Sequence, residues 1–505
     1  MELPAICITG IRNISTSNKD SVILNEVKDL KHKDMKQKNT MGYVIFMAVV
    51  AAIGGILFGY DTAVISGTTT IVKNQFALTD MMEGWYVGCA LIGSICGVLV
   101  AGSLSDYLGR KLTMLISAAL FSISAIGCAV CGSFDGLVAY RIIGGVGIGI
   151  VSIVSPIYIS EVSPAKIRGT LVSLYQLAVT IGFLLAYLMN WIIDANIDPS
   201  IALRATEGAG DITLWQKVMH TEAWRGMLGS ETIPALLFFF IIFFIPESPK
   251  WLIVNGKLDK ASAVLSRIYA TQYEVKEEIE VTNASLKGET KGAWSDLLKP
   301  GILVAVIAGS AIAILGQFMG VNAVLYYGPK IFADAGFDNP MFSTVLVGVV
   351  NCVTTVLAVF IIDRVGRKQL IYWGVSGMII CLLAIGIYFA WGAQIGLGNG
   401  FMLTFFLAYV FCCAISISAI VFVLLSEMYP NSVRGRAMSI AGFALWIGTY
   451  LIGQLTPVLL GWSQAGTFFL FAVMCVPYML IMWKVIPETT GKTLEEIEAY
   501  WNRRK

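Results

Sequence analysis

Three charged cassettes occur twice along this chain, in the same order, and long apolar stretches separate them. The first copies are residues 102–111, 161–169 and 246–249, and the second copies are residues 362–368, 427–435 and 487–490. An ordered repeat of this kind indicates a duplicated structural unit. The chain is therefore expected to fold as two similar halves.

The apolar stretches are long enough to cross a membrane. Hydrophobic residues make up 57% of the chain and charged residues 13%, against roughly 45–50% and about 25% in soluble domains. A helix needs about 20 apolar residues to span the hydrocarbon core of a bilayer. Twelve such segments are predicted, at 43–71, 84–104, 112–132, 136–159, 169–193, 229–245, 301–332, 341–362, 369–391, 400–426, 435–461 and 465–486. The predicted fold class is an all-α membrane protein.

Basic residues indicate the orientation. The connections after the second, fourth, eighth and tenth spans carry Lys or Arg, whereas those after the ninth and eleventh carry neither. Because positive charge marks the cytoplasmic side, both termini are expected inside the cell, with the chain in the inner (plasma) membrane. The expected domains are two six-helix halves at 42–246 and 301–487, a cytoplasmic linker of amphipathic helices at 247–300, and a cytoplasmic tail at 488–505.

The first 41 residues stand apart from the spans. The stretch 15–38 is polar and charged, and Met35 and Met41 each precede the first apolar segment. Residues 1–41 are therefore expected to be a disordered extension or to precede the true start of the protein.

The chain shows no pattern typical of an enzyme. Its two histidines lie outside the spans, and no nucleophile and base occur together. Cys128 and Cys131 have metal-ligand spacing, but no histidine or further cysteine accompanies them. We expect no metal and no cofactor, and the net charge of +2 gives no indication of nucleic acid binding.

Three ionisable residues stand out inside the spans: Asp61, Arg141 and Glu231. Each costs at least about 2.5–3.5 kcal/mol at the centre of a membrane helix, so a function is the default interpretation. One alternative is a purely structural ion pair between Asp61 and Arg141. The other is a proton switch, because an Asp beside an Arg that can move away can bind and release a proton. Glu231, closer to a helix end, can also simply be solvated.

The repeated cassettes contain acids as well as bases. Basic residues alone would fix the topology, since acids contribute little to orientation. Acid and base pairs at neighbouring helix ends would instead form a cytoplasmic lock that breaks and reforms as the halves move. The expected lock residues are Asp106, Arg110, Glu161, Arg168, Glu247, Asp363, Arg367, Glu427, Arg434 and Glu488.

Several motifs together resemble the sugar porter family of the major facilitator superfamily. They are the two Asp-x-x-Gly-Arg-Lys-type cassettes and the stretches 246–252, 317–327 and 487–491. The resemblance covers roughly residues 42–500 and is strongest to the bacterial proton-coupled branch that takes up xylose, arabinose or galactose. It implies two pseudo-symmetric six-helix halves and import of a pentose or hexose with a proton by one chain in a lipid bilayer. It also implies that Asp61 carries the proton, with Arg141 and Glu231 as its partners.

The same resemblance implies a sugar site made by amide and aromatic side chains. Amides offer donors and acceptors to hydroxyl groups, and an aromatic face covers the apolar side of a sugar ring. The matching residues are Gln176, Gln317, Asn322, Tyr326, Asn351 and Trp446. The chain departs from the family pattern at Phe183, Gly316, Ile417, Phe422 and Leu445, where polar or aromatic residues are usual. Helix-to-helix hydrogen bonding remains an alternative role for each amide.

Two other functions remain open. A passive facilitator would share this fold but would not need Asp61. A non-transporting sugar sensor would commonly carry a long cytoplasmic extension, whereas this chain ends soon after residues 494–498. Proton-coupled sugar uptake is the favoured interpretation.

Overall fold

The computed structural model describes residues 16–198, 200–201, 213–269, 271–288, 294–430, 433–489, 496–497 and 500–501. Its regular elements are helices. Within these residues, 12 helices are long and apolar enough to cross a membrane, from Met41–Gln75 to Gln464–Lys484. The prediction of an all-helical protein with twelve spans is confirmed. Most span boundaries lie within a few residues of those predicted, because the charged cassettes fix the helix ends.

The amino-terminal half contains the first six spans. Its elements are α1 (Thr16–Gln75), α2 (Asp80–Leu108), α3 (Arg110–Val130), α4 (Phe134–Val162), α5 (Arg168–Ala195), α7 (Leu214–Gln216), η1 (Lys217–Thr221), α8 (Ala223–Gly229), α9 (Thr232–Ile241) and η2 (Ile242–Phe244). The sixth span is made by α8, α9 and η2 together.

The linker and the carboxy-terminal half follow. The linker contains α10 (Pro249–Val254), α11 (Leu258–Ile268), α12 (Gln272–Gly288) and η3 (Trp294–Leu298). The second half contains α13 (Pro300–Phe318), α14 (Val321–Asp334), α15 (Pro340–Val365), α16 (Arg367–Ile395), α17 (Asn399–Cys413), η4 (Ala414–Ser418), α18 (Ala419–Met428), α19 (Arg434–Trp462) and α20 (Gln464–Lys484).

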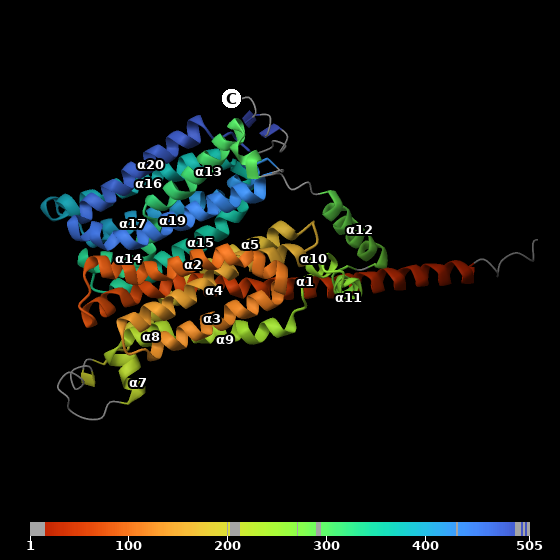
Figure 1. Cartoon of the computed structure of the whole chain (residues 1–505), viewed down its shortest axis with the longest axis horizontal. Coiled ribbons are helices and arrows are strands. Elements are labelled where there is room, and N and C mark those ends of the chain that lie inside the picture. The colour runs from red at the N-terminus through yellow and green to blue at the C-terminus, as the bar shows by residue number, and fades with distance from the viewer. Residues whose placement is uncertain are drawn as a thin grey trace, which may run out of the picture.

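The two halves lie side by side along their length. Figure 1 shows α1–α9 in red to yellow-green below α13–α20 in green to blue, with α10–α12 at one end of the bundle. We call this end the linker end and the opposite one the far end. The last described residue, Trp501, donates from Nε1 to the Met428 carbonyl at 2.8 Å, so the described part of the chain also ends at the linker end.

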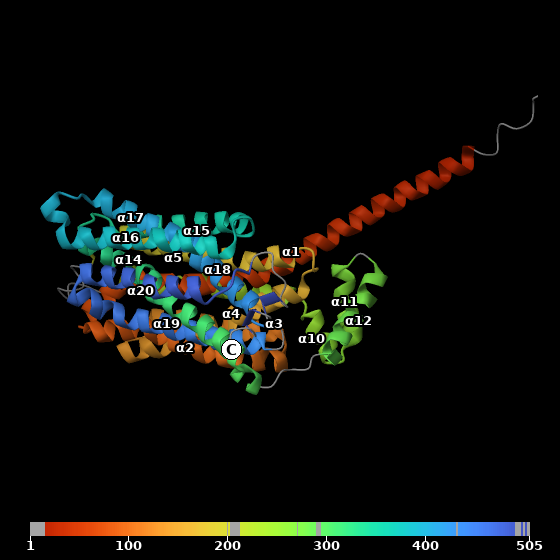
Figure 2. The same ribbon diagram turned by 90° about the horizontal axis from the view of Figure 1, so that it is seen from above.

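Residues 16–40 are described as a continuation of the first membrane helix. Figure 2 shows this part of α1 leaving the bundle at the linker end. The sequence instead favours a disordered extension or a later start for this region. Lys, Leu and Glu in this stretch have good helix propensity, so a helix already formed at residue 41 can continue without tertiary contacts. Residues 1–15 lie outside the described part of the chain.

Glycines let the spans of the first half approach closely. A Cβ atom at Gly145 would lie 2.0 Å from the Ala90 carbonyl oxygen, and one at Gly149 would lie 2.2 Å from that of Ser94. Gly93 is packed equally closely against α4. Such small-residue contacts replace the hydrophobic driving force that membrane helices lack. They make α2 and α4 one rigid unit.

The halves meet mainly along two helix pairs, α2 with α19 and α5 with α15, and α1 also contacts α14. A Cβ atom at Gly84 would lie 2.0 Å from the Gln454 carbonyl oxygen, and one at Gly348 would lie 2.8 Å from the Tyr187 ring. Pro329 adds a polar contact, because its missing N–H leaves the Leu325 carbonyl without a helical partner. The Tyr187 hydroxyl of the other half donates to that carbonyl at 3.0 Å.

Two spans of the second half are broken part-way along their length. The seventh span bends between α13 and α14 at Gly320, whose φ of +93° is strained for other residues. A Cβ atom there would also lie 2.3 Å from the Phe471 ring. The tenth span contains a π-helical turn, η4, a feature that often marks functional sites. Both breaks lie beside the cavities described next.

Candidate functional site

A buried acid and arginine group lies at the centre of the first half. Asp61 on α1 and Arg141 on α4 form an ion pair, with side chains that are 1% and 3% exposed. Glu231, next to α9, is also buried and interacts electrostatically with both. Two carboxyl groups and one guanidinium carry a net charge of −1 when both acids are ionised and 0 when one is protonated. The group can therefore change its charge by binding one proton.

This ion pair lines a cavity of about 100 Å³, which we call the acid cavity. Its walls come from both halves: α1, α2, α4 and α5 on one side, and α14 and α19 on the other. The residues that line this cavity include Phe58, Asp61, Arg141, Phe183, Asn322, Tyr326, Trp446 and Thr449. The rings of Phe58 and Trp446 are 6.0 Å apart, centroid to centroid, across the boundary between the halves.

A second cavity of about 190 Å³ contains most of the predicted amides, and we call it the amide cavity. Gln176 on α5, Gln317 on α13 and Asn351 on α15 line it. Phe58, Phe183 and Asn322 line both cavities. The proton-binding group and the amides therefore face two adjoining spaces that share three side chains.

Hydrogen bonds fix the orientation of two amides. Gln317 Oε1 accepts from Asn322 Nδ2 at 2.6 Å and from Thr449 Oγ1 at 3.2 Å. The Gln317 oxygen is thus occupied, and its NH₂ group is left as the donor for a ligand. Asn322 uses its NH₂ group in this contact, so its carbonyl oxygen is left as an acceptor. A donor and an acceptor side by side suit a sugar hydroxyl group.

The rest of the amide cavity is largely apolar. Phe183, Ile417 and Leu445 form part of its wall. Gly316 leaves room there, because a Cβ atom at this position would meet its nearest neighbour, Ile417, at 3.5 Å. The departures noted in the sequence therefore lie together in this cavity. The amide side chains that line this cavity are Gln176, Gln317, Asn322 and Asn351.

The structure divides the six residues expected to bind sugar. Gln176, Gln317 and Asn351 lie in the amide cavity, whereas Tyr326 and Trp446 lie in the acid cavity beside Asp61. Asn322 belongs to both. Sequence reasoning missed Phe58 and Thr449. Phe58 could have been found three residues before Asp61 on the same helix face, but no local pattern distinguishes Thr449.

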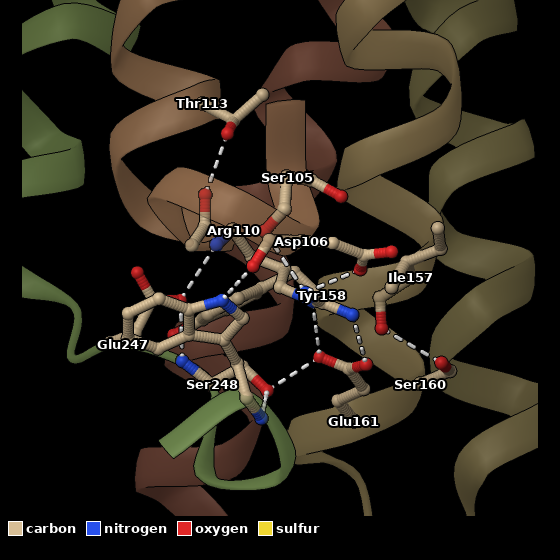
Figure 3. Close-up of polar contacts among 12 residues, drawn as sticks. Ser105, Asp106, Arg110, Thr113, Ile157, Tyr158, Ser160, Glu161, Glu247 and Ser248 are labelled. Atoms are coloured by element: carbon tan, nitrogen blue, oxygen red, sulfur yellow. Dashed lines mark hydrogen bonds and ion pairs between the residues drawn. The ribbon is translucent and has the colours of Figure 1, made fainter. Parts of the chain in front are cut away.

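The cassette residues of the first half form one cluster at the linker end (Figure 3). Arg110 at the start of α3 donates to Glu161 at the end of α4 through two bonds, from Nε at 3.0 Å and Nη2 at 3.1 Å. It also pairs with Asp106 at 3.1 Å. Parallel bonds from one guanidinium to one carboxylate are among the stronger ionic contacts in proteins. Ser248 Oγ donates to the same Glu161 carboxylate.

Glu247 closes this cluster from the start of the linker. Its carboxylate accepts from the backbone N–H groups of Arg110 at 2.9 Å and of Lys111 at 3.2 Å. Gly109, with φ +96°, allows this approach, since a Cβ atom there would lie 2.3 Å from Glu247 Oε2. Burial raises the pKa of Glu247, and the N–H groups oppose that rise.

The second half repeats this arrangement. Arg367 Nη2 donates to Glu427 at 3.2 Å, and Thr489 Oγ1 donates to the same carboxylate at 2.6 Å. Glu488 accepts from the Lys368 backbone N–H at 3.3 Å. Gly366 has φ +94°, close to the +96° of Gly109. The duplicated cassettes thus make duplicated clusters.

The ion pairs of Arg110 with Glu161 and of Arg367 with Glu427 each lie within one half, and Glu247 and Ser248 join the first cluster from the linker. These contacts therefore do not cross between the halves, as the expected cytoplasmic lock would. Arg110 and Arg367 each begin a helix, and the glutamate that each contacts lies at the end of another helix of the same half. Arg168 and Arg434 donate from Nε to the carbonyls of Ser163 and Tyr429, each at 3.4 Å, rather than to an acid. The Asp363 side chain lies outside the described part of the chain.

Two six-helix halves around central cavities, with a buried acid and arginine pair beside them, define a membrane transporter of the major facilitator type. The chain belongs to the sugar transporter family. The family described as "Sugar (and other) transporter" matches residues 47–501.

Similar proteins include named proton symporters. The chain is 38% identical to the arabinose-proton symporter of Bacillus subtilis (strain 168), over 92% of this chain and 96% of that protein. It is 37% identical to the D-xylose-proton symporter of Escherichia coli (strain K12), over 92% of this chain and 97% of that protein. The inward open conformation of the xylose transporter XylE from E. coli matches with a TM-score of 0.78 and 34% identity, over 91% of this chain and 100% of that one.

Proposed function

We propose that this protein imports a monosaccharide, a pentose or hexose, together with a proton by alternating access. The observation that carries the proposal is the buried Asp61 and Arg141 pair, which lines a cavity that shares Phe58, Phe183 and Asn322 with the amide cavity. The names of the two symporters above agree with it. We further propose that the linker end is cytoplasmic, that the membrane is the plasma membrane, and that one chain is the functional unit.

The geometry supports a simple cycle. Protonation of the acid group removes one negative charge and releases Arg141 from Asp61. Because Tyr326 and Asn322 belong to α14, a change around Asp61 reaches the element that also lines the amide cavity. Sugar then binds through Gln176, Gln317, Asn322 and Asn351, and the halves close over both. Release of sugar and proton at the linker end returns Asp61 to Arg141.

Coupling needs a group whose protonation differs between conformations, and Asn cannot titrate. In proteoliposomes, we expect the wild type to accumulate a labelled monosaccharide when a pH gradient is applied. Asp61→Asn should bind and exchange the sugar but lose accumulation. Asp194→Asn is the matched control, because Asp194 is an acid on α5 whose own side chain lines neither cavity.

Two results would contradict the proposal. A wild type that equilibrates sugars but never accumulates them with a pH gradient would be a passive facilitator. Normal accumulation by Asp61→Asn would remove Asp61 as the coupling residue. A panel of pentoses, hexoses and polyols tested as competitors identifies the substrate, and Gln317→Ala should weaken the competition by every true ligand.

A further inference from the structure

Glu83 is a fully buried acid at the far end of the bundle. It lies in the first turn of α2, and its side chain is 0% exposed. Both of its carboxylate oxygens accept from Lys330 Nζ at 2.9 Å. Lys73 Nζ lies 2.7 Å from Oε2 and also pairs with Asp80. A buried acid persists only where charges of this kind compensate it.

The two lysines differ in which half they belong to. Lys73, Asp80 and Glu83 lie on α1 and α2 of the first half, whereas Lys330 lies on α14 of the second half. The four side chains together have no net charge. If the halves separated here, Lys73, Asp80 and Glu83 would keep a charge of −1, and Lys330 would lose its hydrogen bonds to Glu83 and retain only the electrostatic interaction with Asp334 on its own helix. Separation therefore has an electrostatic cost that depends on Glu83 and Lys330.

Other contacts between the halves surround this pair. Gln454 Nε2 on α19 donates to the Met81 carbonyl at 2.9 Å. Gly84, next to Glu83, packs directly against the Gln454 backbone. Further toward the centre, the Tyr187 hydroxyl donates to the Leu325 carbonyl. The charged pair thus lies within a tightly closed seam, unlike the clusters at the linker end, which remain inside their own halves.

We infer that Glu83 and Lys330 form a far-end gate, an ion pair between the halves that holds the cavities closed on one side and must break when that side opens to load substrate. This inference rests on the proposed function, because a gate has a role only if the halves alternate. It assigns to Glu83 and Lys330 a step that Asp61 and the amides do not perform.

The test measures how often the far end opens. Val87 lies one turn after Glu83 on α2, is 3% exposed and lines the acid cavity. Val87→Cys is added to the full-length protein in cells, and a membrane-impermeant maleimide is applied from outside. Protein without Val87→Cys gives the background from native cysteines. Labelling then reports opening of the far end without requiring transport.

We expect Glu83→Gln and Lys330→Met each to increase the labelling rate at least tenfold. The double variant should resemble the single ones, because both changes remove the same contact. Lys73→Met is the matched control: it removes a lysine from the same cluster, but one within the first half, so labelling should change less than threefold. Gly84→Ala, which forces α2 away from Gln454 without changing charge, should also increase labelling.

Unchanged labelling in both Glu83→Gln and Lys330→Met, with Gly84→Ala increased, would overturn the gate. An increase in labelling rate for Lys73→Met equal to that for Lys330→Met would also overturn the gate, because the contact between the halves would then matter no more than a contact within the first half. If a single variant is lost from the membrane, two other variants still test the gate. The double variant leaves neither member of the crossing pair charged and should label faster than wild type. The conservative Lys330→Arg keeps the charge and should label like wild type.

Failure of the proposed function would give a different pattern. If the wild type shows no proton-driven uptake but the gate variants show the labelling changes described above, the gate is supported and the proton coupling is contradicted. If the wild type shows normal proton-driven uptake but labelling is unaltered in every gate variant, the proton coupling is supported and the gate is contradicted.

Discussion

Glu161→Gln tests how much the linker-end cluster stabilises the first half. Removing one partner of a fully buried ion pair costs about 3–5 kcal/mol. Arg110 and Glu161 are 12% and 7% exposed, and the variant keeps one acceptor oxygen. Arg110 also keeps Asp106, which is 75% exposed, and the Ser105 carbonyl at 3.0 Å. We therefore expect a loss of about 2 kcal/mol.

That loss should be visible as a lower thermal midpoint. For a unit of 150–250 residues, similar to one half, 1 kcal/mol corresponds to about 2–4 °C, so a decrease of roughly 4–8 °C is expected. The assay is tryptophan fluorescence of the purified protein in detergent at a fixed heating rate. Glu427→Gln is the control from the other half. Because Glu427 is 27% exposed, we expect it to cost about half as much.

Substrate binding should change little in Glu161→Gln, since the cluster lies at the linker end and not in either cavity. A midpoint equal to that of wild type would refute the reasoning on burial. A larger decrease for Glu427→Gln than for Glu161→Gln would refute the ranking by exposure.

Three further predictions follow from the same structure. Gly109→Ala should cost about 1–3 kcal/mol, because its φ is +96° and the new Cβ would meet Glu247; the thermal midpoint measures this, and an unchanged midpoint would contradict it. Gly316→Ala should fold normally and gain about 0.5–1 kcal/mol of helix stability, since its nearest contact is Ile417 at 3.5 Å; a lower midpoint would show that the space is already filled. Deleting residues 1–34 should leave membrane insertion and uptake nearly unchanged, which surface expression and transport assays check.

The spans were predictable because the membrane imposes one strong rule. Backbone groups in lipid must bond within their own helix, so long apolar segments bounded by charged cassettes leave little choice of structure. The same rule made Asp61 and Arg141 conspicuous, since charges in lipid demand partners. Their pairing was predicted as one alternative from the sequence, and the structure contains it.

Contacts between the halves were harder to predict. Lys330 lies in the predicted seventh span and Glu83 directly precedes the second, yet no spacing relates residues 247 positions apart. The acid that each cassette arginine contacts was also not specified, because the cassettes indicate helix ends but not which helix ends lie side by side. The division of Trp446 and Asn351 between two cavities likewise depends on helix rotation, which the apolar pattern of a membrane span leaves undefined.

The ionic clusters at the linker end separate two properties that are often linked, the stability of the protein and its rate of turnover. The contacts of Arg110 and Arg367 described above lie inside one half each, so they can persist while the halves move as rigid bodies. We therefore expect them to stabilise the protein against heat or detergent with little effect on the rate of turnover. Stability can therefore be tuned at the linker end, whereas a change at Glu83 or Lys330 should alter both the gate and the stability, because Glu83 is fully buried.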